Sequence, residues 1–258
     1  MKKVFVQLMV LVMLLSLCAC GAGTSKTLVY AVEAGSAGEA AAQKNGFEIN
    51  SVDTQAKALM EVQAGTSDAA IIDSLMAGAM VGEGTSYPDL KCTDQKLTEE
   101  LYGVGCRKGS DLAAMINDVF SEAYADGTMR KIAEIYGVQE ALVEQSAPVG
   151  FTPAPGGDVE SIQSKGKLVV GITDFAPMDY KDANGQWIGF DADMARIVAE
   201  KLGVEIEFIE IDWDSKIMEL ESGNIDVVWN GMTLTDAVME AMECTNAYCN
   251  NAQVVVTK

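Results

Sequence analysis

The sequence has 258 residues, with 38 acidic and 18 basic side chains, no histidine and a formal net charge of −20 at pH 7. A chain this acidic is a poor binder of nucleic acids and anionic membranes, but it is compatible with a cationic solute. The absence of histidine excludes histidine-based catalysis and removes the commonest metal ligand. No cysteine spacing fits a zinc site either. We therefore expect no catalytic residue, no metal and no cofactor.

The N-terminus has the pattern of a secretory signal. Two lysines precede about fourteen mostly apolar residues, which are too few for a membrane-spanning helix. The stretch Leu17-Cys18-Ala19-Cys20 resembles a bacterial lipobox, which implies removal of residues 1–19 and a lipid on the Cys20 thiol. Plain secretion with cleavage nearby is the alternative. Residues 20–27 would then form a short polar tether, and the mature chain would carry a charge of −22.

Residues 28–98 alternate between strand and helix patterns. Strands are predicted at 28–35, 47–53 and 67–73, and helices at 35–46, 54–65 and 74–84. This βαβα alternation predicts a parallel sheet covered by helices. We call this region lobe B.

The middle of the chain predicts an extended segment, two helices and a linker. Residues 99–109 are extended, and 111–136 carry a helical pattern that breaks at Asp126-Gly127. Residues 137–159 are rich in proline and glycine and are typical of a linker.

A second alternation of strands and helices follows the linker. Its predicted strands lie at 167–172, 204–212 and 225–231, its helices at 189–203, 214–223 and 235–242, and a last extended segment at 250–258. The pattern again predicts a parallel sheet with helices packed on it.

One sequence unit occurs in both alternations. Residues 58–68 read ALMEVQAGTSD and residues 216–226 read KIMELESGNID, and each copy continues into a short apolar run. The pattern predicts the end of an amphipathic helix, a glycine C-cap and a buried parallel strand. Two copies 158 residues apart indicate two similar α/β lobes. Ligands of open α/β sheets lie beyond the carboxyl ends of the strands. We therefore expect a cleft between the lobes, near Asp73 in one copy and Asn230 to Thr233 in the other.

Several segments resemble the amino-acid-binding proteins of ABC importers, which are extracellular solute-binding proteins of family 3. The segments GKLVVGITDFAPMDYKDANGQWIGFDADMARIVAEKLG, DVVWNGMTLTD and YCNNAQVVVTK are similar to the family's first lobe. The segments AVEAGSAGEAA, IIDSLMAG, YGVGCRKGSD and ADGTMRKIAEIYG are similar to the rest of it. The resemblance implies an α/β, two-lobe periplasmic-binding-protein-like fold of type II, with the ligand cleft between the lobes. Because the family's end precedes its beginning here, the chain looks circularly permuted.

The permutation implies a particular division of the chain. Lobe B would comprise 28–98 and a strand at 253–258, lobe A 103–136 and 160–247, the linker 137–159, and the hinges 99–102 and 248–252. Permutation is tolerated where the original ends are close and the new break falls in an exposed loop. The alternatives are two half-proteins fused by deletion and a domain-swapped pair. We expect an intramolecular permutant and a monomer, with a domain-swapped dimer as the alternative.

The resemblance also implies a set of ligand-binding residues. They are Glu33, Ser36, Ala37, Asp73, Asp174, Phe175, Trp213, Gly231, Thr233 and Val238. Asp73 corresponds to the carboxylate that binds the ligand's ammonium group, a role that suits a carboxylate in a cleft, although a helix N-cap is the alternative. Ser36 and Ala37 would offer hydroxyl and N–H groups to the ligand carboxylate, unless Ser36 serves only in a capping box.

Four further positions would form the opposite side of the site. By the same resemblance, Gly231 offers a backbone carbonyl to the ammonium and Thr233 a hydroxyl, with a tight strand-to-helix turn as the alternative. Phe175 and Trp213 would sandwich the ligand side chain, because aromatic faces supply contact area and attract cations. Without the family context, both aromatic residues would be assigned to the core.

The site departs from the family at the residues that set ligand charge. The family usually has Glu-Arg where Ala237 and Val238 stand, and that arginine grips the ligand carboxylate. Its loss should cost on the order of 2–5 kcal/mol. Glu33 stands where the family tends to have an uncharged or basic residue, and with Asp174 it would make the pocket acidic. The expected ligand is a small cationic amine or a basic amino acid held more weakly than in relatives, and a degenerate site is the alternative.

Three functions follow from these observations. The leading one is a receptor anchored by its lipid to the outer face of the bacterial cytoplasmic membrane, or periplasmic, that closes around its ligand and docks on an ABC permease. An enzyme of the same fold, such as a dehydratase, would need an acid or base in the cleft, and no catalytic constellation is visible. A sensor or interaction module with weak or no ligand binding is the third.

Overall fold

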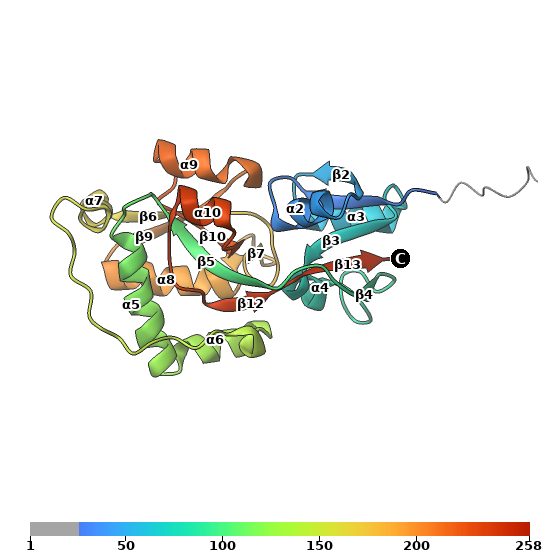
Figure 1. The fold of residues 1–258 in the computed structure, drawn as a ribbon. Helices are drawn as coiled ribbons and strands as arrows, with labels where there is room; N and C mark the ends of the chain where they lie inside the picture. Colours follow the sequence, from blue (N-terminus) through green and yellow to red (C-terminus); the bar gives the residue numbers. More distant parts are fainter. Residues whose placement is uncertain (1–25) are drawn as a thin grey trace, which may run out of the picture.

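The computed structural model describes residues 26–258. The predicted signal peptide, the predicted lipidation at Cys20 and most of the predicted tether lie outside the described residues. The described chain forms two α/β lobes, one on each side of a pair of crossing strands (Figure 1). No helix within residues 26–258 is long and apolar enough to cross a membrane.

Lobe B is built on a five-stranded sheet in the order β2-β1-β3-β13-β4. Its elements are β1 (Val29–Glu33), α2 (Ala37–Lys44), β2 (Glu48–Val52), α3 (Gln55–Ala64), β3 (Ala69–Asp73), α4 (Ser74–Met80), β4 (Lys91–Lys96) and β13 (Gln253–Thr257). Strands β2, β1 and β3 are parallel, as the βαβα alternation predicts. Strand β13 runs antiparallel between β3 and β4, so the sheet is mixed. The polar, exposed β4 has no apolar run and is absent from the sequence-based prediction.

Lobe A is built on a six-stranded sheet in the order β11-β5-β10-β6-β9, with β12 also paired to β5. Its elements are β5 (Glu100–Cys106), α5 (Leu112–Ala125), α6 (Thr128–Tyr136), the 3-10 helix η1 (Gln139–Ala141), α7 (Asp158–Lys165), β6 (Lys167–Ile172), β7 (Tyr180–Lys181), β8 (Trp187–Ile188), α8 (Phe190–Leu202), β9 (Glu205–Glu210), the 3-10 helix η2 (Trp213–Ser215), α9 (Lys216–Ser222), β10 (Val227–Thr233), α10 (Asp236–Ala241), β11 (Glu243–Cys244) and β12 (Cys249–Asn251). Strands β10, β6 and β9 are parallel, whereas β5 runs antiparallel to β10.

The repeated sequence unit folds in the same way in both lobes. Helices α3 and α9 end at Gly65 and Gly223, whose left-handed φ angles of 79° and 78° close the helix. An aspartate then fastens the following strand to its parallel neighbour. The Asp68 carboxylate accepts the Val29 N–H at 3.0 Å, and the Asp226 carboxylate accepts the Val169 N–H at 2.8 Å.

The two lobes are connected by strands that run side by side. Strand β5 leaves lobe B beyond β4, and β12 returns toward it, with Asn251 opposite Glu100 in an antiparallel ladder. The chain then continues into β13, which pairs with β3 and β4 in lobe B (Figure 1). A segment from the end of the sequence therefore lies in the sheet formed by its beginning. Because both connections lie in one ladder, a change in the angle between the lobes must bend two hydrogen-bonded strands together.

The proline- and glycine-rich linker is docked on lobe A. Its extended part passes along α5 (Figure 1), where the buried Asp118 carboxylate accepts the N–H groups of Gly150 at 2.8 Å and Phe151 at 3.2 Å. Helix α7 begins at Asp158, inside the last residues of the predicted linker. The linker thus has defined hydrogen-bond partners, which its composition alone does not reveal.

Candidate functional site

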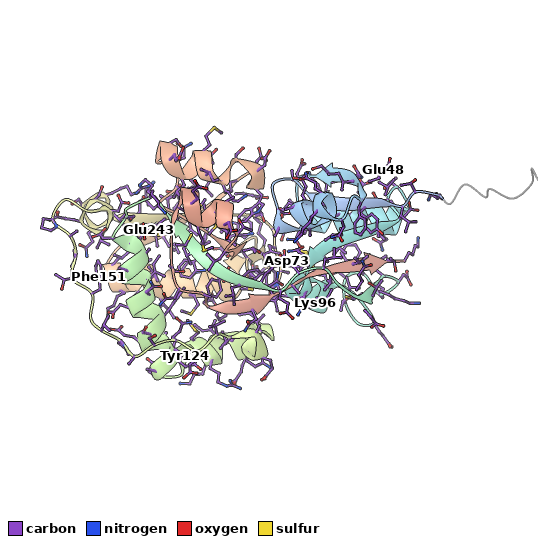
Figure 2. All side chains as sticks on the ribbon, in the orientation of Figure 1. Glu48, Asp73, Lys96, Tyr124, Phe151 and Glu243 are labelled. Carbon is purple, nitrogen blue, oxygen red and sulfur yellow. The ribbon has the colours of Figure 1, made fainter. Side chains whose placement is uncertain are left out.

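The two lobes enclose a cavity of about 360 Å³. Both lobes contribute to its lining, with Glu33, Ser36, Ala37 and Asp73 from lobe B and Phe175, Trp213, Gly231, Thr233 and Val238 from lobe A. Figure 2 shows Asp73 at the boundary between the lobes, beside the crossing strands. The structure therefore brings together all of the site residues predicted from the sequence except Asp174.

Asp174 lines a separate groove with Met80 and Tyr180, outside the cavity. The chain bends at Asp174, directly before Phe175, and of these two neighbours only Phe175 lines the cavity. The expectation that Asp174 acidifies the pocket is therefore wrong. The acidity comes instead from Glu33 and Asp73, which both line the cavity.

Asp73 lies at the end of the buried strand β3 and accepts hydrogen bonds from several directions. The Tyr102 hydroxyl donates to it at 2.8 Å and the Gln253 amide at 3.0 Å, and the Gln55 and Asn251 amides donate to it as well. Burial, followed by the negative charge of Glu100, raises the pKa of Asp73 to about 7, although the amide and hydroxyl donors oppose the shift. Asp73 occupies the N-cap position of α4, but its side chain makes no capping hydrogen bond and accepts instead from the donors named above.

Glu33 ends the neighbouring strand β1 and has fewer partners. Its side chain is only 4 % exposed, and its Oε1 atom has no hydrogen-bond partner. Burial, followed by the charge of Asp73, raises the pKa of Glu33 to about 8. A buried carboxyl oxygen without a donor is costly. Glu33 is therefore the group in this cavity that most needs a donor from a ligand.

Glu100 links the acidic wall to lobe A. Its carboxylate accepts the hydroxyl of Thr233 and the amides of Asn251 and Gln253, each at 3.0 Å. Thr233, which we expected to offer its hydroxyl to the ligand, therefore donates its proton to Glu100 in this structure. Its oxygen remains an acceptor toward the cavity. The same amides contact Asp73, so the two carboxylates share donors at the crossing of the lobes.

The N-terminus of α2 borders the other side of the cavity. Ser36 is the N-cap, and its hydroxyl accepts the Glu39 N–H at 3.1 Å. The Glu39 carboxylate in turn accepts the Gly35 N–H at 2.9 Å, in an arrangement close to a capping box. Ser36 thus caps the helix while it also lines the cavity. The N–H groups of Ala37 and Gly38 have no acceptor within a helix at this position and give the helix end its affinity for anions.

The walls contributed by lobe A are mostly apolar. Phe175 packs so closely against Gly231 that a Cβ atom at residue 231 would lie 2.3 Å from the Phe175 ring. Gly231 also has a φ angle of 55°, which favours glycine, and its N–H donates to Asp191 at 2.7 Å. Trp213 and Val238 belong to one buried cluster at the base of α9 and α10. The position at which the family has its arginine is therefore part of an apolar wall.

One functional side chain was missed by the sequence reasoning. Lys216, the first residue of α9, lines the cavity and is only 7 % exposed. Its ammonium group donates to the carbonyls of Gly35 at 2.9 Å and Trp213 at 3.0 Å, and lies 4.7 Å from the centre of the Trp213 ring. Burial lowers the pKa of the Lys216 ammonium, and the carboxylates of Glu33 and Asp214 partly offset that shift. A lysine at the start of an amphipathic helix is usually solvated, so its sequence context carried no signal.

The site has no arrangement suited to a metal. Within residues 26–258, no group of three or more acidic or cysteine side chains is placed to hold an ion. The thiols of Cys92, Cys106, Cys244 and Cys249 are all free, and none of these four residues lines the cavity. The arrangement can bind a small polar molecule between an acidic wall, a helix N-terminus and two aromatic rings.

The fold and the cavity define the class: a two-lobed α/β protein with a cavity between the lobes. Residues 168–258 match the model of the bacterial extracellular solute-binding proteins, family 3, so that the chain is related to this family through its C-terminal third. The curated relatives that it matches include proteins named as binding arginine or cystine and a probable amino-acid ABC transporter-binding protein.

Two curated relatives and one solved structure illustrate the similarity. The chain is 30 % identical over 118 residues to the arginine-binding extracellular protein ArtP of Bacillus subtilis. The aligned segment covers 45 % of this chain and 46 % of that protein. It is 32 % identical over 100 residues to a probable amino-acid ABC transporter-binding protein of Haemophilus influenzae, covering 38 % and 39 %. A structure of an ancestral cationic amino acid solute binding protein shares 40 % identity, with a TM-score of 0.32, and covers 33 % of this chain and 37 % of that one. The chain thus spans about half or less of the length of the relatives it matches.

Proposed function

We propose that this protein is the solute receptor of an ABC importer and that it binds a free amino acid, preferably one with a basic side chain, in the cavity between its lobes. The observation that carries the proposal is the buried carboxyl of Glu33, a residue that lines the cavity and whose Oε1 atom has no hydrogen-bond donor. An ammonium or guanidinium group would satisfy that oxygen and neutralise the charge that burial disfavours.

The ligand is expected to lie across the cavity in a defined direction. Its cationic groups would meet Glu33 and Asp73 on the acidic wall, and its side chain would lie between Phe175 and Trp213. Its carboxylate would meet the N-terminus of α2, where Ala37 supplies an N–H group. The names of relatives that bind arginine agree with this ligand class.

The order of segments supports a circular permutation of the family's fold. Strand β13, the last in the chain, completes the lobe B sheet between β3 and β4. The linker 137–157 is docked between the helical end of one family segment and the start of the next. The partial coverage of curated relatives agrees as well, because an alignment that keeps sequence order can match only one side of a permutation point. We propose the division made from the sequence, with hinges at 99–102 and 248–252.

Transport would require partners that the cavity does not supply. We propose that the receptor is held outside the cell by the predicted lipid at Cys20, and that its closed form docks on a membrane permease with its ATPase. Closure follows from the geometry, because the cavity is lined from both lobes and a ligand in it contacts both. An enzymatic role is not proposed, because the cavity presents carboxyls and aromatic rings but no nucleophile with a positioned base.

Calorimetric titration of the mature chain with free amino acids and small amines tests this function. Arginine or lysine should bind with a 1:1 stoichiometry, and glutamate should not bind. Asp73→Asn, which keeps the shape but removes the charge, should weaken a basic ligand by about 10- to 100-fold. A folded protein that binds no member of the panel would contradict the proposal and would favour a sensor or interaction module of the same fold.

A further inference from the structure

Lys216 stands out because it is a buried cation whose hydrogen bonds go to carbonyls. Its ammonium donates to Gly35 in lobe B and to Trp213 in lobe A. An ammonium has three N–H groups, so one donor remains for another acceptor. A buried charge without a close counter-ion is costly, and a negatively charged ligand group beside it would remove most of that cost.

The position of Lys216 coincides with the anion-binding end of the cavity. Gly35, which accepts from the ammonium, directly precedes Ser36 and Ala37 at the N-terminus of α2. The lysine charge and the free N–H groups of the first helical turn therefore face the same part of the cavity. These are two independent donors for a carboxylate.

The lysine also comes from the wall that lacks the arginine. Its ammonium lies above the ring of Trp213, and Trp213 packs in one cluster with Val238. Val238 is buried and apolar, so it leaves that wall without a charge of its own. Lys216, from α9, would therefore supply to the cavity the positive charge that Val238, from α10, does not.

We infer that Lys216 binds the carboxylate of the ligand and takes the place of the arginine that is missing at Val238. This inference rests on the proposed function, and it adds the residue that distinguishes amino acids from amines. Because both Lys216 and Glu33 line the cavity, it selects a ligand with both a carboxylate and a cationic group.

Comparing arginine with agmatine, its decarboxylated analogue, tests the inference. In the Lys216→Met variant, arginine should bind about 10- to 100-fold more weakly, while agmatine should change by less than about threefold. Lys216→Arg should retain the preference for arginine. Lys181→Met is the matched control, because Lys181 also lies over a tryptophan ring, at 4.5 Å from the centre of Trp187, but is exposed and outside the cavity.

The possible outcomes separate the two claims. An equal loss of arginine and agmatine in Lys216→Met would show that Lys216 only joins the lobes through Gly35, and would overturn the inference alone. Unchanged arginine binding would overturn it as well. If the wild-type protein binds no amino acid or amine of the panel, the proposed function fails first, and the inference fails with it. If Lys216→Met does not unfold cooperatively, Lys216→Gln replaces it and should show the same selective loss for arginine.

Discussion

The two copies of the repeated unit share a scaffold and differ in chemistry. Gly65 and Gly223 close their helices with the same left-handed geometry, and Asp68 and Asp226 fasten the next strand with the same hydrogen bond. Eight residues after each glycine, however, lobe B has Asp73 and lobe A has Gly231. Strand β3 therefore ends in a buried carboxylate, whereas β10 has, at the equivalent position, backbone packed against an aromatic ring.

This difference shows which positions serve folding and which serve the site. The positions that the two copies share close the helix and fix the strand, so the fold requires them in both lobes. The positions that differ lie at the cavity, where one wall supplies charge and the other supplies shape. Lys216 follows the same rule, because the corresponding residue of the first copy is the buried Ala58.

The largest effect is expected at Gly231. Gly231→Ala would force a non-glycine residue into a φ of 55° and place a Cβ atom 2.3 Å from Phe175. We expect a loss of about 2–5 kcal/mol in the free energy of unfolding from backbone strain and overpacking. Gly65→Ala and Gly223→Ala, where nothing lies within 4 Å of the new Cβ, should each cost only about 1–2 kcal/mol. Urea unfolding of the three variants would decide, and three equal losses would contradict the close packing at Gly231.

The second prediction concerns the pH dependence that Glu33 introduces in the ligand-free protein. Its pKa of about 8 lies above the ordinary value of 4.5, so the folded state holds a proton that the unfolded state has lost. Stability from this group is therefore complete below pH 4.5 and is lost as the pH rises toward 8. Glu33→Gln removes this dependence. The free energy of unfolding of the variant, relative to that of the wild type, should therefore rise by on the order of 3 kcal/mol between pH 5 and pH 8. The free energy of unfolding of both proteins is measured from pH 5 to pH 8. If the two curves run parallel, Glu33 has an ordinary pKa and the prediction is contradicted.

A third prediction compares the two fastening aspartates. Asp226 is only 4 % exposed and interacts with Lys165 and Arg107, whereas the Asp68 side chain is 25 % exposed and has one exposed lysine partner. Asp226→Asn should therefore cost about 2–4 kcal/mol, because it leaves two cations without their counter-ion. Asp68→Asn should cost clearly less, because water screens that ion pair. Thermal unfolding of the two variants measures this difference, and equal or reversed losses in melting temperature would contradict the prediction.

The smallest effect is expected from the docking of the linker. Asp118→Ala removes the carboxylate that accepts the N–H groups of Gly150 and Phe151 and should cost about 1–2 kcal/mol. Limited proteolysis should then cut the linker faster than in wild type. Glu144→Ala, at an exposed linker position, is the control. Equal cleavage rates would mean that the linker is a loose tether, as its composition alone suggests.

Much of the fold could be predicted because apolar periodicity and glycine caps mark its elements. Helices α5 and α6, broken at Gly127, and the strands β1, β3, β6 and β10 all carry such patterns. Strand β4 could not be predicted, since it is polar and is held by pairing with β13, far away in the sequence. Local sequence patterns reveal strands that are buried. Strand β4 is exposed and is held by its hydrogen bonds to β13, which leave no pattern in its own sequence.

The candidate site shows the same division between local and distant information. Motif resemblance placed Asp73, Phe175 and Gly231 at one cavity, because strand ends meet there. It failed for Asp174, which lies at a bend after β6 and lines a separate groove. It also missed Lys216, because only the approach of Gly35 from the other lobe buries that ammonium.

In the proposed complex, a cationic ligand group meets the buried acids of lobe B, whose pKa values are raised. Titration calorimetry with arginine at pH 7, repeated in buffers of different ionisation enthalpy, tests this contact. Because Glu33 has a pKa of about 8 and Asp73 of about 7, a guanidinium beside them should drive their ionisation and release about one proton per ligand bound. Citrulline, the neutral analogue of arginine, should bind more weakly and release markedly fewer protons. Arginine binding with no proton release, or with the same release as citrulline, would contradict the claim.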